Sequence, residues 1–241
     1  MMFSAYAARA IISLRDNERV LEFTLGGGVG AWAEAEIDIR RSRFIGRLVR
    51  VESEHDARDV IESARQRHGD ARHHCSAFVL GSGTQPDQVR RSHDDGEPSG
   101  TAGRPILDVL NGRHLIDCVA VVTRYFGGTL LGAGGLVRAY SDATTAAVEQ
   151  ATVAPGLVLR QRRQLFRLPL PHADAGRIEA ELRQRGVVVR GTEYDDVAVM
   201  TLTTALNGER ALAALVAGVT AGARMLEPAG IEWVDAPPPT P

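Results

Sequence analysis

A short acidic segment, SHDDGEPSGTAGRP at residues 92–105, has the highest density of chemically capable side chains in the sequence. It stands directly before a predicted helix, whose first backbone N–H groups lack partners and attract anions. Asp, Ser and Thr side chains are equally good helix caps. The segment therefore has three possible roles: it forms turns and a cap, it is a binding surface, or its carboxylates hold Mg²⁺ or act as a base. The candidate residues of this acidic loop are Asp94, Asp95, Gly96, Glu97, Ser99 and Thr101.

A glycine-rich segment, TRYFGGTLLGAGGLVRAY at residues 123–140, runs from a predicted buried strand into a helix. Glycines expose backbone N–H groups and a helix N-terminus carries partial positive charge, so this segment can cradle a phosphate. Arg124 and Arg138 are placed to grip one anion together. The alternative is close packing of the helix against the strand. The GK[ST] ending of a P-loop is absent, which argues against nucleotide hydrolysis of that type. The glycines concerned are Gly127, Gly128, Gly132, Gly134 and Gly135.

The segment ARHHCSAF, residues 71–78, places two histidines beside a cysteine. On a strand, His73 and Cys75 face one side and His74 the other, and no second ligand pair completes a zinc site. We therefore predict no metal and no cofactor. Cys75 and Cys118 are expected to be small buried side chains.

Every one of the 28 basic residues is arginine, which excludes mechanisms that need a lysine amine. Residues 31–155 hold 15 arginines against 17 acidic residues, and residues 156–241 hold 10 of each, so charge alone does not indicate nucleic-acid binding. Such binding requires a few arginines to gather on one face. Those beside the acidic and glycine-rich loops are Arg43, Arg104, Arg124 and Arg138.

The remaining composition predicts a folded cytoplasmic protein of two domains, with no membrane span. We expect a poorly ordered extension over residues 1–30, a first domain over 31–154, a second over 158–235 and a Pro-rich tail over 236–241. In the first domain, helices are predicted from Ser53 onward, over 101–112 and after the glycine-rich loop. Strands are predicted over 33–39, 43–51, 73–81, 88–92 and 117–126, the last of them central.

The second domain reads as βαββαβ, the order of a ferredoxin-like sandwich. Its predicted helices cover residues 172–185 and 208–221. Its strands are expected near residues 163–170, 187–194, 197–204 and 225–234. It contains no cluster of reactive side chains, which is typical of a binding or spacing module.

At four motifs the sequence resembles the IMPACT family, specifically its bacterial YigZ-like branch. These motifs are SRFIG (42–46), DARHHCSAFVLG (70–81), SHDDGEPSGTAGRPIL (92–107) and VVTRYFGGTLLGAGGLVRAY (121–140). The resemblance implies an α+β fold whose first domain is similar to the second domain of a small-subunit ribosomal protein. It also implies that the ferredoxin-like second domain resembles the C-terminal domain of elongation factor G. In this family no catalytic role attaches to the shared residues.

Eukaryotic members of the family regulate translation under nutrient stress by binding a partner of the initiation-factor kinase. The resemblance therefore favours a non-enzymatic regulator that binds RNA, the ribosome or a translation factor. One alternative is an enzyme that acts on a phosphorylated small molecule, with the glycine-rich loop holding the phosphate and the DDGE carboxylates supplying metal ligands or a base. The other is a protein-interaction module in which a basic partner recognises the acidic loop.

Overall fold

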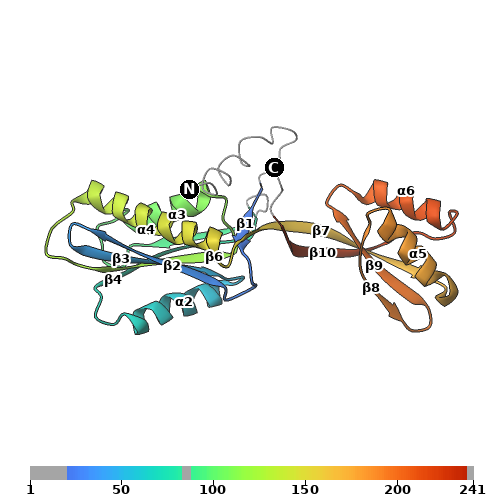
Figure 1. Ribbon diagram of the computed structural model, residues 1–241, viewed down its shortest axis with the longest axis horizontal. Coiled ribbons are helices and arrows are strands. Elements are labelled where there is room, and N and C mark those ends of the chain that lie inside the picture. Colours follow the sequence, from blue (N-terminus) through green and yellow to red (C-terminus); the bar gives the residue numbers. More distant parts are fainter. Residues whose placement is uncertain (1–20, 83–87, 238–241) are drawn as a thin grey trace. The chain divides into compact units, whose positions relative to one another are not determined.

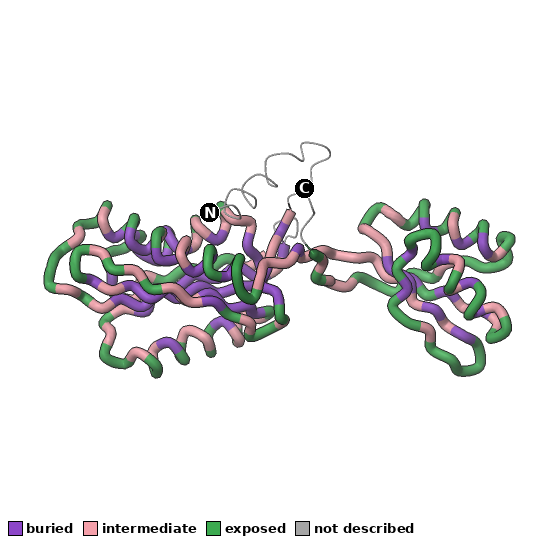
Figure 2. Tube along the Cα trace, in the orientation of Figure 1, coloured by how far each residue is buried: buried purple, intermediate pink, exposed green. Residues whose placement is uncertain are grey.

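The computed structural model describes residues 21–82 and 88–237 of the 241-residue chain, which forms two compact units (Figure 1). The first unit contains the described residues up to Arg160 together with those from Asp235 onward, and the second spans Gln161–Val234. The fold is of the mixed α+β class, as predicted. Each unit has its own buried core (Figure 2).

A five-stranded antiparallel sheet forms the centre of the first unit. Its strands lie in the order β2-β3-β6-β4-β5. They cover Trp32–Ile39 (β2), Ser42–Arg50 (β3), His73–Leu80 (β4), Val89–His93 (β5) and Cys118–Tyr125 (β6). The apolar run of β6 is buried along almost its whole length, because helices cover both faces of the sheet. The prediction that this strand is central is therefore confirmed.

Three helices form the outer layers of this unit. They are α2 (Glu54–Arg67), α3 (Gly103–Gly112) and α4 (Ala133–Val153). Figure 1 shows α2 on one face of the sheet and α3 with α4 on the other. Helix α2 begins where predicted, since the Ser53 side chain accepts a hydrogen bond from the Asp56 backbone N–H at 3.1 Å. Helix α4 lies so close to β3 that a Cβ at Gly46 would come within 2.4 Å of the Ala143 carbonyl oxygen.

The prediction that residues 1–30 form a poorly ordered extension is wrong for the part that the structure describes. Phe23–Leu25 form strand β1, which pairs antiparallel with the start of β7 (Leu157–Leu170). Leu25 and Thr24 are fully buried, and the Arg50 guanidinium donates to the Leu25 carbonyl. The three-residue strand Phe23–Leu25 is too short for periodicity in the sequence to identify it. Residues 1–20 lie outside the described residues.

Ion pairs between buried and half-buried side chains hold Asp235, near the C-terminal end of the described residues, within the first unit. Arg160 contacts the carboxylates of Asp117, Glu52 and Asp235 at 2.9–3.0 Å. Arg50 also pairs with Asp235, at 2.5 Å. The tail predicted over residues 236–241 starts too early, because Ala236 is still part of strand β10. Pro238–Pro241 lie outside the described residues.

The second unit has the βαββαβ order that the sequence predicts. Its elements are β7, α5 (His172–Gln184), β8 (Val188–Tyr194), β9 (Ala198–Ala205), α6 (Glu209–Val219) and β10 (Glu227–Ala236). The strand order β10-β7-β9-β8 places the first and third strands in the middle, which is the ferredoxin-like arrangement. Phe166, Met200 and Leu182 are fully buried where the helices pack on the sheet.

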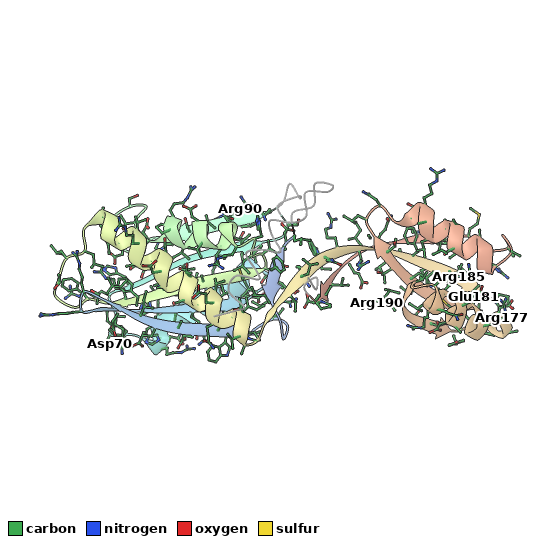
Figure 3. All side chains as sticks on the ribbon, turned by 45° about the horizontal axis from the view of Figure 1, so that its top comes forward. Asp70, Arg90, Arg177, Glu181, Arg185 and Arg190 are labelled. Carbon is green, nitrogen blue, oxygen red and sulfur yellow. The ribbon has the colours of Figure 1, made fainter. Side chains whose placement is uncertain are left out.

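Charged side chains on α5 and at its C-terminal end are largely paired with neighbours one turn away. Glu181 on α5 pairs with Arg177 at 3.8 Å and with Arg185 at 2.6 Å, and all three are labelled in Figure 3. Such exposed pairs contribute little to stability. In the described part of the chain, no helix is both long and apolar enough to cross a membrane.

Candidate functional site

The acidic loop begins with a carboxylate that organises the backbone. Asp94 Oδ1 accepts hydrogen bonds from the N–H groups of Ala102 and Gly103 at 3.0 and 2.8 Å, and Oδ2 accepts one from Gly100 at 2.8 Å. Partial burial by itself raises the pKa of Asp94, but these three backbone donors outweigh it and leave the pKa below its ordinary value. Asp94 thus accepts hydrogen bonds from backbone N–H groups at the start of α3, as expected if the acidic loop forms turns and a helix cap.

The second aspartate fixes the loop to the sheet and to α2. Asp95 Oδ2 accepts from the His74 backbone N–H at 2.7 Å, while Oδ1 pairs with Arg65 at 2.9 Å. Burial raises the pKa of Asp95, and the His74 N–H and Arg65 lower it by more. His74 itself is buried on the α2 side of the sheet beside Thr123 Oγ1, at 3.1 Å, and burial lowers its pKa. Both side chains therefore have structural partners.

Glu97 lies at the centre of a buried polar cluster on the α4 side of the sheet. Its Oε1 accepts hydrogen bonds from Arg124 Nη1 at 2.5 Å and from the Tyr140 hydroxyl at 2.8 Å. Cys75 Sγ lies 3.3 Å from the Tyr140 oxygen, and His73 Nε2 lies 4.0 Å from Glu97 Oε1. The four elements β4, β6, α4 and the acidic loop thus meet at one carboxylate.

The environment of this cluster suppresses ionisation of its weaker acids. Burial raises the pKa of the Cys75 thiol to about 12, and burial together with the neighbouring Cys75 and Glu97 raises the pKa of Tyr140 well above its ordinary value. Cys118 is fully buried in β6, and burial raises its pKa too. Both cysteines are buried small side chains, as predicted.

The structural reason for which glycine is favoured differs among the positions that follow β6. A Cβ at Gly127 would lie 1.9 Å from the Arg41 carbonyl oxygen, so this glycine permits close contact with the β2–β3 turn. Gly128 and Gly132 have φ values of +83° and +70°, which favour glycine. A Cβ at Gly134 would meet no described atom within 4 Å, and its φ is not positive. Close packing thus explains Gly127 but not Gly134.

Beside the Glu97–Arg124 pair the surface is hollowed into a groove of about 420 Å³. Its floor is polar and its rim is apolar: Phe126 is 41% exposed and Leu130 is 82% exposed. The start of α4 forms one wall. We call this the α4 groove; it is lined by Arg72, His73, Glu97, Pro98, Arg124, Phe126, Leu130, Leu131, Gly132, Ala133 and Leu136.

The four arginines singled out in the sequence do not gather on one face. Arg124 pairs across the sheet with Phe44, so Arg43, its neighbour in β3, points to the opposite face and stacks on Tyr125 at 4.3 Å. Arg104 pairs with Asp108 on α3 at 2.8 Å, and both side chains are exposed. Arg138 is exposed on α4 about half a turn away from the groove residue Leu136.

The structure therefore gives no support to the expectation that Arg124 and Arg138 hold one anion together. Arg124 is 6% exposed and is already paired with Glu97, whereas Arg138 does not line the groove. The alternation along β3 and β6 could have separated Arg43 from Arg124 in advance, but the Glu97 partner comes from a loop whose path the sequence does not show.

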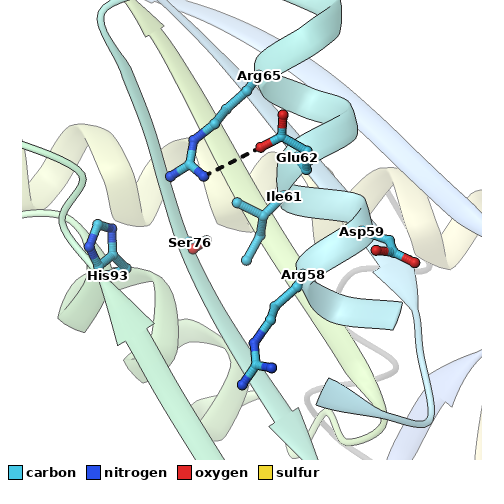
Figure 4. Close-up of a pocket in the computed structure, with 7 residues that line it drawn as sticks. All are labelled: Arg58, Asp59, Ile61, Glu62, Arg65, Ser76 and His93. Carbon is cyan, nitrogen blue, oxygen red and sulfur yellow. Dashed lines mark ion pairs between the residues drawn. The ribbon is translucent and has the colours of Figure 1, made fainter. Parts of the chain in front are cut away.

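A second hollow, of about 390 Å³, lies between α2 and strands β4 and β5 (Figure 4). Its charged groups are engaged with neighbours: Arg65 pairs with Glu62 and Asp95, and Arg58 pairs with Glu54. His93 Nδ1 accepts a hydrogen bond from the Asp95 backbone at 3.0 Å. Because these groups already have partners, we regard the α4 groove as the candidate site.

Within residues 21–82 and 88–237, no three His, Cys, Asp or Glu side chains are grouped so that they could hold a metal ion. The three carboxylates that the sequence analysis considered as Mg²⁺ ligands each contact a different partner. Asp94 faces the start of α3, Asp95 faces β4, and Glu97 faces Arg124.

Comparison with known proteins identifies a family of similar proteins. The pattern of the Impact N-terminal domain matches residues 40–148, and that of a domain of unknown function, DUF1949, matches residues 168–223. The IMPACT family member YvyE of Bacillus subtilis (strain 168) is 42% identical over 163 residues, which cover 68% of this chain and 72% of the relative. The chain belongs to the IMPACT family.

Other IMPACT family proteins agree with this assignment. The IMPACT family member YigZ of Escherichia coli (strain K12) is 47% identical over 115 residues, 48% of this chain and 56% of that protein. A crystal structure described as that of an hypothetical protein is similar with a TM-score of 0.56 and 31% identity, and covers 86% of this chain and 97% of that one.

The α4 groove lies entirely within the part of the chain that matches the Impact N-terminal domain. Eight of its residues were not among the site residues that we predicted from the sequence: Arg72, His73, Pro98, Phe126, Leu130, Leu131, Ala133 and Leu136. A signal existed for Phe126 and Leu130, because each is a large apolar residue inside a glycine-rich loop. Arg72 gave no signal of its own among 28 arginines.

Proposed function

We propose that this IMPACT family protein is a non-enzymatic, translation-linked regulator that acts in the cytoplasm by binding RNA of the translation machinery through the α4 groove. The link to translation rests on the family to which the chain belongs. Binding rather than catalysis is supported by the state of the reactive side chains at the site.

One observation carries the preference for binding: the reactive side chains beside the groove already have hydrogen-bond partners within the protein. The carboxylates of Asp94 and Asp95 accept hydrogen bonds from backbone N–H groups, and Glu97 is occupied by Arg124 and Tyr140. Burial keeps Cys75 protonated near neutral pH, so it supplies no thiolate nucleophile. A general base or nucleophile would have to break these contacts before it could act.

The groups that the groove leaves open are suited to recognition. Arg72 is exposed and makes no hydrogen bond or ion pair with any described residue. Phe126 offers an exposed ring on which a base can stack, and the start of α4 offers backbone N–H groups to a phosphate. Cationic donors beside an exposed aromatic ring are the combination that single-stranded nucleic acid requires.

Co-sedimentation with ribosomes, measured at a series of salt concentrations, tests the proposal. Binding at low salt that weakens steeply as salt rises is expected, because each neutralised phosphate releases counterions. Phe126→Ala should reduce binding at every salt concentration. Met225→Ala, which removes an 83%-exposed side chain in the second unit, is the control and should leave binding unchanged.

Four results would contradict this function. One is the absence of co-sedimentation at low salt, and another is binding that does not depend on salt. The third is a pull-down of ribosomal proteins that survives complete nuclease treatment, which would favour a protein-interaction module instead. Turnover of a phosphorylated small molecule in the presence of Mg²⁺ would restore the enzymatic alternative.

A further inference from the structure

We propose that the first turn of α4, together with Arg124 and Arg72, is the phosphate-binding subsite of the α4 groove. It is specific for the phosphate of a nucleotide unit whose base lies on Phe126. This rests on the proposed function for the source of the phosphate, a single-stranded RNA. The subsite itself is argued from the geometry of the groove.

The start of α4 is an open end of a long helix. Helix α4 has 21 residues, and Gly132 at its N-cap has no side chain that could accept a hydrogen bond from the first turn. No described side chain caps this turn, and it contains no acidic residue. Its backbone N–H groups therefore keep their donors free and carry the positive end of the helix dipole, which favours an anion.

A buried guanidinium that is only partly satisfied lines the same groove. Arg124 is 6% exposed, and among the described residues only its Nη1 donates a hydrogen bond, to Glu97. Its Nε is buried and has no partner in the described structure. Buried donors without partners are costly. The Arg124 guanidinium also lies 5.4 Å from the centre of the Phe44 ring and 5.6 Å from that of the Phe126 ring, which lines the groove. An acceptor that enters the groove would reduce this cost.

The surface at the start of α4 leaves room for close approach. Gly132 and Ala133 are exposed and line the groove, and Gly134 is a helical glycine whose missing Cβ no described neighbour would contact. Glycine is unfavourable inside a helix, so a glycine that packing does not require indicates a backbone kept accessible.

The charges around the subsite favour an anion despite a carboxylate in the groove. Glu97 carries the one acidic side chain among the lining residues, and Arg124 compensates its charge at 2.5 Å. Arg72 adds a positive charge that has no described acidic partner. The exposed Phe126 ring beside Arg124 then provides a stacking surface for the adjoining base.

Backbone NMR of the full chain tests the subsite directly. Inorganic phosphate, adenosine monophosphate and an eight-nucleotide single-stranded RNA are titrated separately. All three should shift the amide resonances of Ala133, Gly134 and Gly135. The two nucleotide probes should also shift the Phe126 ring, and the RNA should bind at least tenfold more tightly than inorganic phosphate. If none of the three amides responds to any probe, the subsite does not exist.

A charge at the first helical position provides the matched variant. Ala133→Asp places a carboxylate where the phosphate would lie, yet an acidic residue in the first turn favours the helix. It should therefore weaken RNA binding at least tenfold while the melting temperature stays the same or rises. Ala173→Asp, in the exposed first turn of α5, adds the same charge to the second unit and should leave RNA binding unchanged. Equal affinities of the two variants would overturn the proposal.

The salt dependence separates the subsite from the proposed function. Arg72→Ala should lower the slope of log affinity against log salt by about one, whereas Arg210→Ala, an exposed arginine at the start of α6, should not. Shifts of the three amides and of the Phe126 ring by adenosine monophosphate, without any ribosome binding, would leave the subsite standing and remove the proposed function. Ribosome binding that Ala133→Asp and Arg72→Ala leave unchanged would remove the subsite and keep the function.

Discussion

Arg124 Nη1 donates a 2.5 Å hydrogen bond to Glu97 Oε1, and the side chains of both residues are more than nine-tenths buried. The two residues lie 27 positions apart, at the end of the central strand and in the acidic loop. Their contact, together with that of Asp95 to β4, holds the loop against the sheet. It joins the acidic loop to the glycine-rich segment through one ion pair.

Removal of one partner of this pair should be strongly destabilising. Glu97→Ala would leave the Arg124 guanidinium buried without a counter-charge, at a cost of about 3–5 kcal/mol in the free energy of unfolding. Urea denaturation at neutral pH measures this loss. The matched control is Asp108→Ala, which breaks the exposed Arg104–Asp108 pair on α3 and should cost about 0.5 kcal/mol or less. Equal costs for the two variants would show that the buried pair is not structural.

Acid should weaken the first domain through its aspartates. In the folded state the pKa values of Asp94, Asp95 and Asp235 are all held below their ordinary values, by backbone donors or by arginines that outweigh the effect of burial. The stability that these groups provide is therefore present above their unfolded pKa, about pH 4, and is lost as the pH falls through the lower folded values.

Thermal unfolding between pH 2 and pH 6 measures this dependence. Asp94→Asn should make the curve of melting temperature against pH shallower below pH 4, because it removes one of the titrating groups. Asp142→Asn, at an exposed aspartate on α4 with no described hydrogen bond or ion pair, is the matched control for the replacement of an aspartate by asparagine. A curve of Asp94→Asn that stays parallel to that of the native chain would contradict the assignment.

Both cysteines should be inert to thiol reagents in the native protein. Burial raises the pKa of Cys75 to about 12, so at pH 8 this thiol stays protonated, and Cys118 is fully buried. Iodoacetamide should modify neither residue in the native protein and both residues in 6 M urea, with mass spectrometry as the readout. Rapid native modification of Cys75 would show that the polar cluster opens readily.

The glycines of the loop should respond differently to alanine. Gly127→Ala places a Cβ 1.9 Å from the Arg41 carbonyl oxygen, so the loop or the β2–β3 turn must move. We expect a loss of about 1–3 kcal/mol in urea denaturation, as for other overpacked positions. Gly176→Ala, at an exposed helical position in α5 where a Cβ meets no described atom, is the control and should be neutral or stabilising. Comparable losses would mean that the close contact at Gly127 is not rigid.

Much of the fold follows from local pattern. The apolar run of β6 predicts its central place, the capping residue Ser53 predicts the start of α2, and the alternation at His73 and His74 predicts which face each side chain occupies. These features depend on residues that are close together in the sequence, where periodicity and capping act.

The arrangement of the site depends on contacts that local pattern does not encode. Asp94, Asp95 and Glu97 are nearly adjacent, yet each takes a different partner, on α3, β4 and β6 respectively. A carboxylate in a turn has no periodicity that shows where it points. For the same reason the four arginines beside these loops could be identified from the sequence, whereas their separation onto different faces required the path of the chain.

A substitution in strand β1 tests whether this N-terminal strand contributes to the core of the first unit. Leu25 is fully buried, and the backbone of Phe23 both donates to the His114 carbonyl and accepts from the Ile116 N–H at 2.9 Å. Leu25→Ala should therefore lower the free energy of unfolding by about 2–5 kcal/mol, because it leaves a cavity beside buried neighbours. Val29→Ala, at a 56%-exposed position four residues later, is the control and should change stability by less than about 0.5 kcal/mol. A Leu25→Ala variant as stable as the native chain would mean that β1 does not belong to the core, and urea denaturation of the full chain distinguishes the two outcomes.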